Sequence, residues 1–205
     1  MVRTADSIRA HVEALAQRDP IFAGVIAQHG MPEPRISEPG AHTLLRTIVG
    51  QQVSVAAARS MWAKVEAAFG SPPDLEAILN ASDEELRAAG MSRQKSGYMR
   101  SLAGLVTSGE LDLYALPQDD EEAIAHLTRI KGIGRWSAEI YLLFAEGRAD
   151  VFPAGDLAVV NELGRLMGRK RKLSEKRLRQ IAKKWRPYRG AAAVLAWHSY
   201  NSAVL

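Results

Sequence analysis

The segment LTRIKGIG, Leu127–Gly134, carries the strongest local signal for the fold. Two glycines stand one residue apart between two stretches of helical periodicity, in the pattern apolar-x-x-apolar-x-Gly-apolar-Gly. Glycine allows tight backbone geometry and a close approach that a Cβ would block. Free N–H groups at the start of the next helix form a ready phosphate site, and Lys131 and Arg135 add positive charge nearby. The segment predicts a helical hairpin that contacts a phosphate; the alternative is an ordinary glycine-rich turn between helices.

Helical periodicity continues over almost the whole chain on both sides of this segment. Apolar residues recur every three or four positions through residues 44–69, and turn residues such as the glycine and prolines of 70–73 separate the stretches. No useful strand alternation is present, so we expect an all-α protein with eight to eleven helices and a crossing loop at 31–40. Further expected helices cover residues 82–89, 94–106, 121–127, 136–145, 157–167, 174–185 and 191–200.

The amino-acid composition excludes several kinds of catalytic group and cofactor. The 205 residues contain no cysteine, which excludes disulfides, a thiol nucleophile, Cys-ligated zinc and an iron–sulfur cluster. The five histidines lack metal-ligand spacing, so no metal or other cofactor is expected in catalysis. No apolar run is long enough to span a membrane and the N-terminus lacks the apolar region of a signal peptide, so we expect a cytoplasmic, nucleoid-associated protein.

Positive charge is concentrated near the C-terminal end. Twelve Lys or Arg residues and one acidic residue, Glu175, lie between Arg165 and Arg189, although the net charge of the whole chain is only +4. Such a block suggests a polyanionic partner, usually a nucleic acid. A solvated helical face explains the charge equally well at this stage.

Asp156 follows the hairpin at a distance of 22 residues. The intervening chain is predicted to form one helix and a loop, after which Asp156 starts the next helix. An aspartate before an apolar helix is what N-capping alone predicts. Taken by itself, Asp156 therefore indicates a helix start and no chemistry.

The combination of these features resembles the helix-hairpin-helix DNA glycosylase superfamily. The hairpin is followed at the family's spacing by VFPAGDLAV, residues 151–159, and two more stretches are similar to family segments: LLRTIVGQQVS at 44–54 and GMSRQK at 90–95. Many members carry a Thr-His pair after the aspartate, where this chain has Leu157 and Ala158. That departure matches the alkylpurine branch, 3-methyladenine DNA glycosylase II. The resemblance runs from about residue 20 to the C-terminus.

This resemblance implies a single fold of two helical lobes with a cleft between them. We expect the lobes at about 41–134 and at 1–40 plus 135–205. The implied catalytic carboxylate is Asp156. The residues implied to contact DNA are Gln51, Gln52 (whose side chain would fill the gap left by a flipped base), Lys95, Lys131, Gly132, Gly134 and Arg135. The backbone carbonyls implied to hold a Na⁺ or K⁺ ion that bridges to a phosphate belong to Thr128, Ile130 and Ile133.

The residue two positions after Gly134 indicates the type of chemistry. Bifunctional family members have a lysine nucleophile there, whereas this chain has Trp136, so we expect a monofunctional enzyme without lyase activity. The Trp136 indole can stack on a cationic alkylated purine. Trp197 is a second pocket candidate, with core packing as its alternative, and Ile140 replaces a pocket tyrosine of the family.

The expected function is excision of alkylated purines of the 3-methyladenine and 7-methylguanine class from double-stranded DNA, by base flipping and hydrolysis of the N-glycosidic bond in base excision repair. The enzyme is expected to act as a monomer. A non-catalytic helix-hairpin-helix module that binds DNA or senses damage is the alternative. A bifunctional glycosylase/lyase would need a lysine near Asp156.

Overall fold

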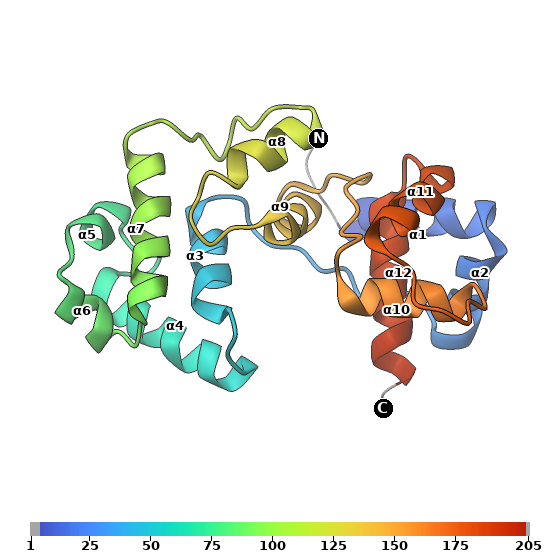
Figure 1. Ribbon diagram of the computed structural model, residues 1–205, viewed down its shortest axis with the longest axis horizontal. Coiled ribbons are helices and arrows are strands. Elements are labelled where there is room, and N and C mark those ends of the chain that lie inside the picture. The colour runs from blue at the N-terminus through green and yellow to red at the C-terminus, as the bar shows by residue number, and fades with distance from the viewer. Residues whose placement is uncertain (1–4, 204–205) are drawn as a thin grey trace. The chain divides into compact units, whose positions relative to one another are not determined.

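The computed structural model describes residues 5–203, and within these residues all regular structure is helical (Figure 1). A π-helix, η1 (Leu142–Glu146), follows α9 directly, and a 3₁₀ turn, η2 (Lys183–Trp185), follows α11. The α-helices are α1 (Ala5–Arg18), α2 (Pro20–His29), α3 (Ala41–Gly50), α4 (Val55–Phe69), α5 (Leu75–Asn80), α6 (Asp83–Ala88), α7 (Arg93–Thr107), α8 (Asp120–Leu127), α9 (Arg135–Tyr141), α10 (Leu157–Leu166), α11 (Glu175–Ala182) and α12 (Arg189–Ala203). The all-α prediction is confirmed.

Short polar side chains start most of these helices. In each case a serine or aspartate oxygen accepts a hydrogen bond from a backbone N–H group of the first turn, which satisfies a donor that the helix itself leaves unpaired. Ser82 and Glu85 form a reciprocal capping box at the start of α6. The residues that cap in this way are Asp19, Ser54, Asp74, Ser82, Ser92, Asp119, Asp156 and Ser174.

The expected number of helices was too low, since residues 5–203 contain twelve α-helices. The apolar period through 44–69 is interrupted by a turn in which Gln52 has a φ of 55°, so it forms two helices, α3 and α4. Helix α5 has only six residues, too few for a periodic pattern, and Asp74 caps it. The loop at 31–40 is free of regular structure, as predicted.

The chain divides into two compact units. One is continuous, Ser37–Tyr141, and the other is discontinuous, formed by the described parts of Met1–Ile36 and Leu142–Leu205. The expected boundary after Gly134 is displaced to the end of α9. Helix α9 belongs to the continuous unit because Arg135 pairs with Glu121 of α8 and the Tyr141 hydroxyl accepts a hydrogen bond from the Gly40 N–H.

The core of the discontinuous unit forms around α12, which packs against α1, α2 and α10. Small residues on α12 permit close packing: a Cβ on Gly190 would lie 2.6 Å from Leu143 Cδ1 and 2.7 Å from the Ala149 carbonyl oxygen. Trp185 is fully buried there, and its indole N–H donates to Asp19 Oδ2 at 2.8 Å. A burial of this kind requires a partner for the indole nitrogen, which Asp19 supplies.

The core of the continuous unit forms between α3 and α7, with α4, α5 and α6 packed around them. Leu127 and Ile130, in the hairpin segment Leu127–Gly134, are completely buried, and Ile133 is nearly so. These three side chains anchor the hairpin to its unit and fix its position. No helix among residues 5–203 combines the length and the apolar character needed to cross a membrane.

Candidate active site

Asp156 is the N-cap of α10, as the sequence predicts. Its Oδ1 accepts hydrogen bonds from the Val159 backbone N–H at 3.0 Å and from the Trp197 indole N–H at 3.1 Å. Asp156 remains partly exposed. The carboxylate thus has a fixed orientation through its Oδ1 atom, while the group as a whole stays accessible.

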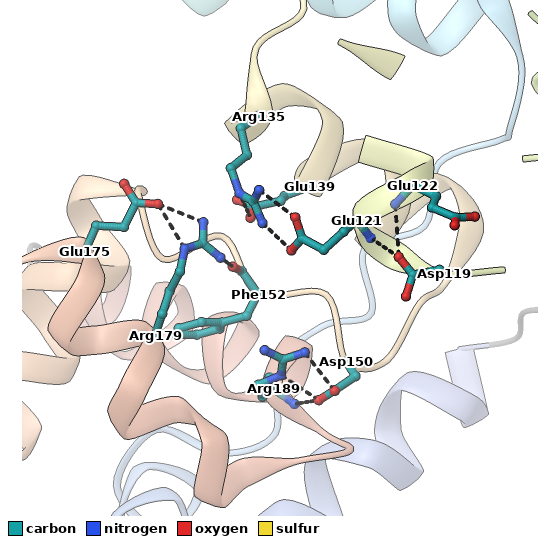
Figure 2. A network of polar contacts seen from close by, with 10 residues as sticks. All are labelled: Asp119, Glu121, Glu122, Arg135, Glu139, Asp150, Phe152, Glu175, Arg179 and Arg189. Carbon is teal, nitrogen blue, oxygen red and sulfur yellow. Dashed lines mark hydrogen bonds and ion pairs between the residues drawn. The ribbon is translucent and has the colours of Figure 1, made fainter. Parts of the chain in front are cut away.

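The loop before Asp156 is held by an ion pair on α11 (Figure 2). Arg179 donates to the Phe152 carbonyl at 3.1 Å and to Glu175 Oε1 at 2.8 and 3.0 Å. Glu175 also lies against Gly155, where a Cβ would come within 3.2 Å of the carboxylate. The α11 pair therefore determines the path of residues 152–155, and with it the place where α10 begins.

Trp197 is half-buried on α12, with its ring 5.6 Å from the ring of Phe144. The sequence predicts Trp197 as a wall of a base pocket, with core packing as the alternative. In the structure its indole N–H points at Asp156, 41 residues away in the sequence. The contact makes Trp197 a partner of the candidate catalytic carboxylate.

The hairpin between α8 and α9 depends on one of its two glycines for its shape. Gly132 has a φ of +85°, and a Cβ there would overlap the ring of Tyr98 on α7. The Lys131 N–H donates to Ser101 Oγ at 3.0 Å, which ties the hairpin to α7 a second time. Around Gly134, by contrast, a Cβ would meet no atom within 4 Å.

The surface of the hairpin leaves backbone donors unused. Within residues 5–203 we find no acceptor for the N–H groups of Gly132 and Gly134. The open space at Gly134 means that no internal packing requires a glycine there. A donor of this kind, on an open surface, is suited to an acceptor from outside the chain.

The turn after α3 is tied to the hairpin. The Gln51 side-chain amide donates to the Gly132 carbonyl at 2.8 Å, and Lys95 Nζ donates to the Val49 carbonyl at 2.7 Å near the C-terminal end of α3. These bonds hold Gln52 in an exposed position with a φ of 55°, the one positive φ of a non-glycine residue between 5 and 203. A left-handed backbone at a residue with a side chain is strained and is commonly retained at functional sites.

Three of the predicted DNA contacts therefore have internal partners. The ammonium of Lys95 supports the turn, and burial lowers its pKa. Arg135 binds Glu121 and, at 3.0 Å, Glu139, an arrangement shown in Figure 2. The hydrogen bonds that the Arg135 guanidinium donates to the Glu121 carboxylate are the main cause of the raised pKa of Arg135. The Gln51 amide is likewise engaged, whereas Lys131 and Gln52 are exposed.

Trp136 and Ile140 lie on α9 in the continuous unit. They are four residues apart, which places them on one face of the helix. Trp136 is 47% exposed, an unusual degree for a large aromatic side chain. The structure thus brings Trp136 together with Ile140, and it brings Asp156 together with Trp197.

The hairpin carbonyls predicted to hold a cation have a suitable chemistry. The Ile130 carbonyl accepts one hydrogen bond, from the Ile133 N–H at 3.0 Å, and keeps a lone pair. For the Thr128 and Ile133 carbonyls, residues 5–203 provide no donor. No cluster of three His, Asp or Glu side chains that could hold a metal ion is found in the same part of the chain.

The residues that hold the hairpin and the loop before Asp156 in place were not predicted from the sequence. Tyr98 and Ser101 shape the hairpin, and Glu175 with Arg179 holds the loop before Asp156. Only the Glu175–Arg179 pair had a signal, since oppositely charged residues four apart on a helix form ion pairs.

Several known proteins are similar to this chain in sequence and in structure. "DNA-3-methyladenine glycosylase 1" of Schizosaccharomyces pombe is 33% identical over 165 residues, which is 78% of this chain and 72% of that protein. The solved structure of S. pombe 3-methyladenine DNA glycosylase in complex with abasic DNA matches 96% of this chain and 97% of its own, with a TM-score of 0.79 and 27% identity. A DNA-3-methyladenine glycosidase structure from Bacillus halodurans matches 95% of this chain and 90% of its own, with a TM-score of 0.85 and 31% identity.

Coverage of the relatives is partial. The chain spans between 50% and 72% of the length of four of the curated relatives it matches. Residues 45–187, which include the hairpin, the loop and Asp156, match a family described as "HhH-GPD superfamily base excision DNA repair protein". The resemblance found in the sequence is confirmed: the chain belongs to the HhH-GPD superfamily of base excision DNA repair proteins.

Proposed function

We propose that this protein is a monofunctional DNA glycosylase that removes alkylated purines from double-stranded DNA, with Asp156 as its catalytic carboxylate. The observation that carries the proposal is the fixed orientation of Asp156 by the Val159 N–H and the Trp197 indole in a chain of this family. Relatives with the name DNA-3-methyladenine glycosylase support the choice of substrate class.

Binding would begin at the hairpin. The unused N–H groups of Gly132 and Gly134 provide donors for a backbone phosphate, and Lys131 adds a positive charge. A Na⁺ or K⁺ ion on the carbonyls of Thr128, Ile130 and Ile133 would supply further positive charge toward that phosphate. Replacing K⁺ by tetramethylammonium at equal ionic strength should then weaken DNA binding, and unchanged binding would remove the ion from the scheme.

The base must leave the stack before its bond can be hydrolysed. Gln52 is exposed on a strained turn that Gln51 and Lys95 hold in place, and its side chain is the candidate to fill the gap in the duplex. Trp136, half-exposed on α9, is the candidate to stack on the cationic purine, an interaction worth about 1–2 kcal/mol when water is excluded.

The chemical step requires one carboxylate. The bond between C1′ and the base nitrogen breaks, its electron pair leaves with the cationic purine as a neutral base, and the sugar acquires positive charge. Asp156 stabilises that charge, a water oxygen bonds to C1′, and the water proton passes to the carboxylate or to solvent. Because the leaving base carries a positive charge, a strong general acid is unnecessary.

We also infer that the enzyme does not cut the DNA strand and acts as a monomer. A lyase needs a lysine that forms a Schiff base with the sugar, and the position used for that lysine is Trp136. Borohydride trapping on damaged DNA should give no covalent adduct, and light scattering should give the mass of one chain.

Release of 3-methyladenine and 7-methylguanine from methylated duplex DNA tests the main proposal. The wild-type chain should release these bases, and Asp156→Asn, which keeps the capping oxygen, should be slower by at least about 100-fold. A wild-type chain that binds DNA but releases no base over hours would be a non-catalytic module. Full activity of Asp156→Asn would remove Asp156 from its role.

A further inference from the structure

The basic segment Arg165–Arg189 separates into two sets of side chains in the structure. Five of its twelve cations form ion pairs with carboxylates of the discontinuous unit, at distances from 2.6 to 3.5 Å. Two of these pairs lie within one helix, and the other three connect different elements of the unit. Its members are Arg165 with Glu162, Arg179 with Glu175, Lys184 with Asp19, and Arg186 and Arg189 with Asp150.

The other seven cations are exposed and form no ion pair within residues 5–203. Four of them are consecutive in the connection between α10 and α11, and two more lie in the first turn of α11. We call these six residues the basic loop surface. It consists of Arg169, Lys170, Arg171, Lys172, Lys176 and Arg177.

The backbone of this surface is fixed at both ends. Gly168, with a φ of 64°, donates to the Arg165 carbonyl and the Arg169 N–H donates to the Gly164 carbonyl, which is the Schellman ending of a helix. At the other end Ser174 accepts from the Arg177 N–H and caps α11. Only five residues lie between these two features, and Leu173 among them packs against the core. The cations are therefore presented from a short connection tied down at each end.

Folding alone does not favour this arrangement. Like charges on adjacent residues repel each other, and cations in the first turn of a helix oppose its dipole, which favours acidic residues there. The first turns of α6 and α8 contain three acidic residues each, whereas the first turn of α11 contains only Glu175, next to the two cations. The basic loop surface thus collects charge where stability is lowered by it, which indicates that the charge acts on a partner.

Helix α11 connects the surface to the loop of Asp156. Glu175 and Arg179, four residues apart on one face, hold the Phe152 carbonyl, while Leu178 and Ala182 enter the core. Lys176 and Arg177 lie on the remaining, exposed face. One short helix therefore carries two residues of the basic loop surface and the clamp of the candidate catalytic loop, which Figure 2 shows.

We propose that the basic loop surface is a second DNA-binding site, which holds the phosphate backbone of the duplex in addition to the hairpin. The inference rests on the proposed function for the choice of DNA as the polyanion. Duplex DNA carries one negative charge for about every 1.7 Å of its axis, so several consecutive cations can neutralise neighbouring phosphates without reading bases.

The test is the salt dependence of binding to an undamaged 20-base-pair duplex, measured by fluorescence anisotropy with Lys170→Gln/Arg171→Gln/Lys172→Gln. The matched control is Arg59→Gln/Lys64→Gln/Arg87→Gln, which removes three exposed, unpaired cations of the continuous unit. Both variants lower the net charge from +4 by three, to +1. Neither variant should melt below the wild type, because these six side chains form no hydrogen bond or ion pair within residues 5–203, and the loop variant should melt at the same or a higher temperature because it removes repulsion between like charges.

The slope of log K against log salt concentration is negative, and in the loop variant it should become less steep by about 2 to 3, since each lost phosphate contact contributes about 0.9. Its affinity near ~0.1 M salt should fall about 10- to 100-fold, with a clearly smaller change in the control. Equal slopes for the loop variant and the control would overturn the proposal. The proposal would also be overturned if the loop variant lost affinity only for duplex RNA or for polyglutamate of similar charge, because the surface would then bind another partner.

The readout separates this proposal from the proposed function. Binding to undamaged DNA requires no release of a base. If the protein has no glycosylase activity but the loop variant changes the salt slope, the basic loop surface still binds DNA and only the proposed function fails. If the enzyme is active and the loop variant leaves the salt slope unchanged, the basic loop surface is not a DNA-binding site.

Discussion

The two units of the molecule orient their functional groups by different means. In the continuous unit the hairpin takes its shape from the backbone: Gly132 has a positive φ, and its surface follows from the residues next to it. In the discontinuous unit Asp156 is oriented by side chains from distant parts of the chain, Trp197 on α12 and Arg179 on α11. The first arrangement depends on the backbone conformation of one residue, which Tyr98 and Ser101 of α7 then hold in place, whereas the second depends on side chains from distant elements.

This difference predicts different kinds of sensitivity. A hairpin built on backbone geometry should fail when a Cβ is added at one glycine, and should tolerate the same change where space is open. A carboxylate oriented by side chains should lose activity in small steps, because each partner contributes one hydrogen bond. Three substitutions examine this comparison.

The largest effect is expected for Gly132→Ala. Its Cβ would overlap the Tyr98 ring and the residue would need a φ of +85°, so the variant should lose about 2–4 kcal/mol of unfolding free energy. Denaturant unfolding measures this loss. If Gly132→Ala is as stable as the wild type, the hairpin does not depend on this glycine.

Gly134→Ala is the matched control for that experiment. No atom lies within 4 Å of the added Cβ, and the residue has no positive φ, so its stability should stay within about 0.5 kcal/mol of the wild type. Its affinity for DNA should fall nevertheless, because the methyl group occupies the surface proposed for the phosphate. A strong loss of stability at Gly134 would contradict the distinction between the two glycines.

A smaller effect is expected for Trp197→Phe, which keeps a ring beside Phe144 and removes the indole N–H from Asp156. One hydrogen bond to a charged group contributes about 1.5–3 kcal/mol, so we expect the single-turnover rate of base release to fall about 10- to 100-fold. Single-turnover kinetics on methylated duplex DNA measure this rate, and denaturant unfolding of the same variant shows whether the fold is retained.

Trp185→Phe is the matched control. It removes the corresponding indole N–H from Asp19 in the same unit, so it should lower stability and leave the single-turnover rate of base release close to that of the wild type. If both variants slow base release equally, Trp197 acts on the fold and has no specific role in positioning Asp156.

The comparison also explains which features could be read from the sequence. The all-α class, the hairpin between two helices and the capping position of Asp156 were predicted correctly, because each depends on residues within a few positions of one another, although the number of helices was too low. The contact between Trp197 and Asp156 was not predicted, since it joins residues 41 apart. The hydrogen bond from the Lys95 ammonium to the Val49 carbonyl, 46 residues away, was missed for the same reason.

Charge was the least predictable property. Helical spacing indicates the partners of Arg165 and Arg179, which lie three and four residues from Glu162 and Glu175. The sequence gives no sign of the other pairs, because the carboxylates of Asp19 and Asp150 come from distant elements. Arg135 was expected to meet a phosphate by its position near the hairpin, but Glu121 of the preceding helix binds it. Local patterns predicted where charge is concentrated, and only the fold separates the structural cations from the exposed ones.

The smallest expected effect concerns acid. Glu162 is buried on α10; burial raises its pKa, but hydrogen bonds from Arg165 and Ser199 outweigh burial and leave the pKa below its ordinary value. A carboxyl with a lowered pKa stabilises the fold at neutral pH, and this contribution disappears as the pH falls below about 4 through the folded-state pKa.

Glu162→Gln should therefore melt a few degrees below the wild type at pH 7, where roughly 1 kcal/mol corresponds to about 2–4 °C, and this difference should shrink toward pH 3. Glu85→Gln is the control: its pKa is also lowered, by hydrogen bonds from Ser82, but the group is fully exposed, so its melting temperature should change little at either pH. Melting curves between pH 7 and 3 measure both. If the difference in melting temperature between Glu162→Gln and the wild type stays constant over this range, the network acts through packing. The charge of the buried carboxylate would then not stabilise the discontinuous unit.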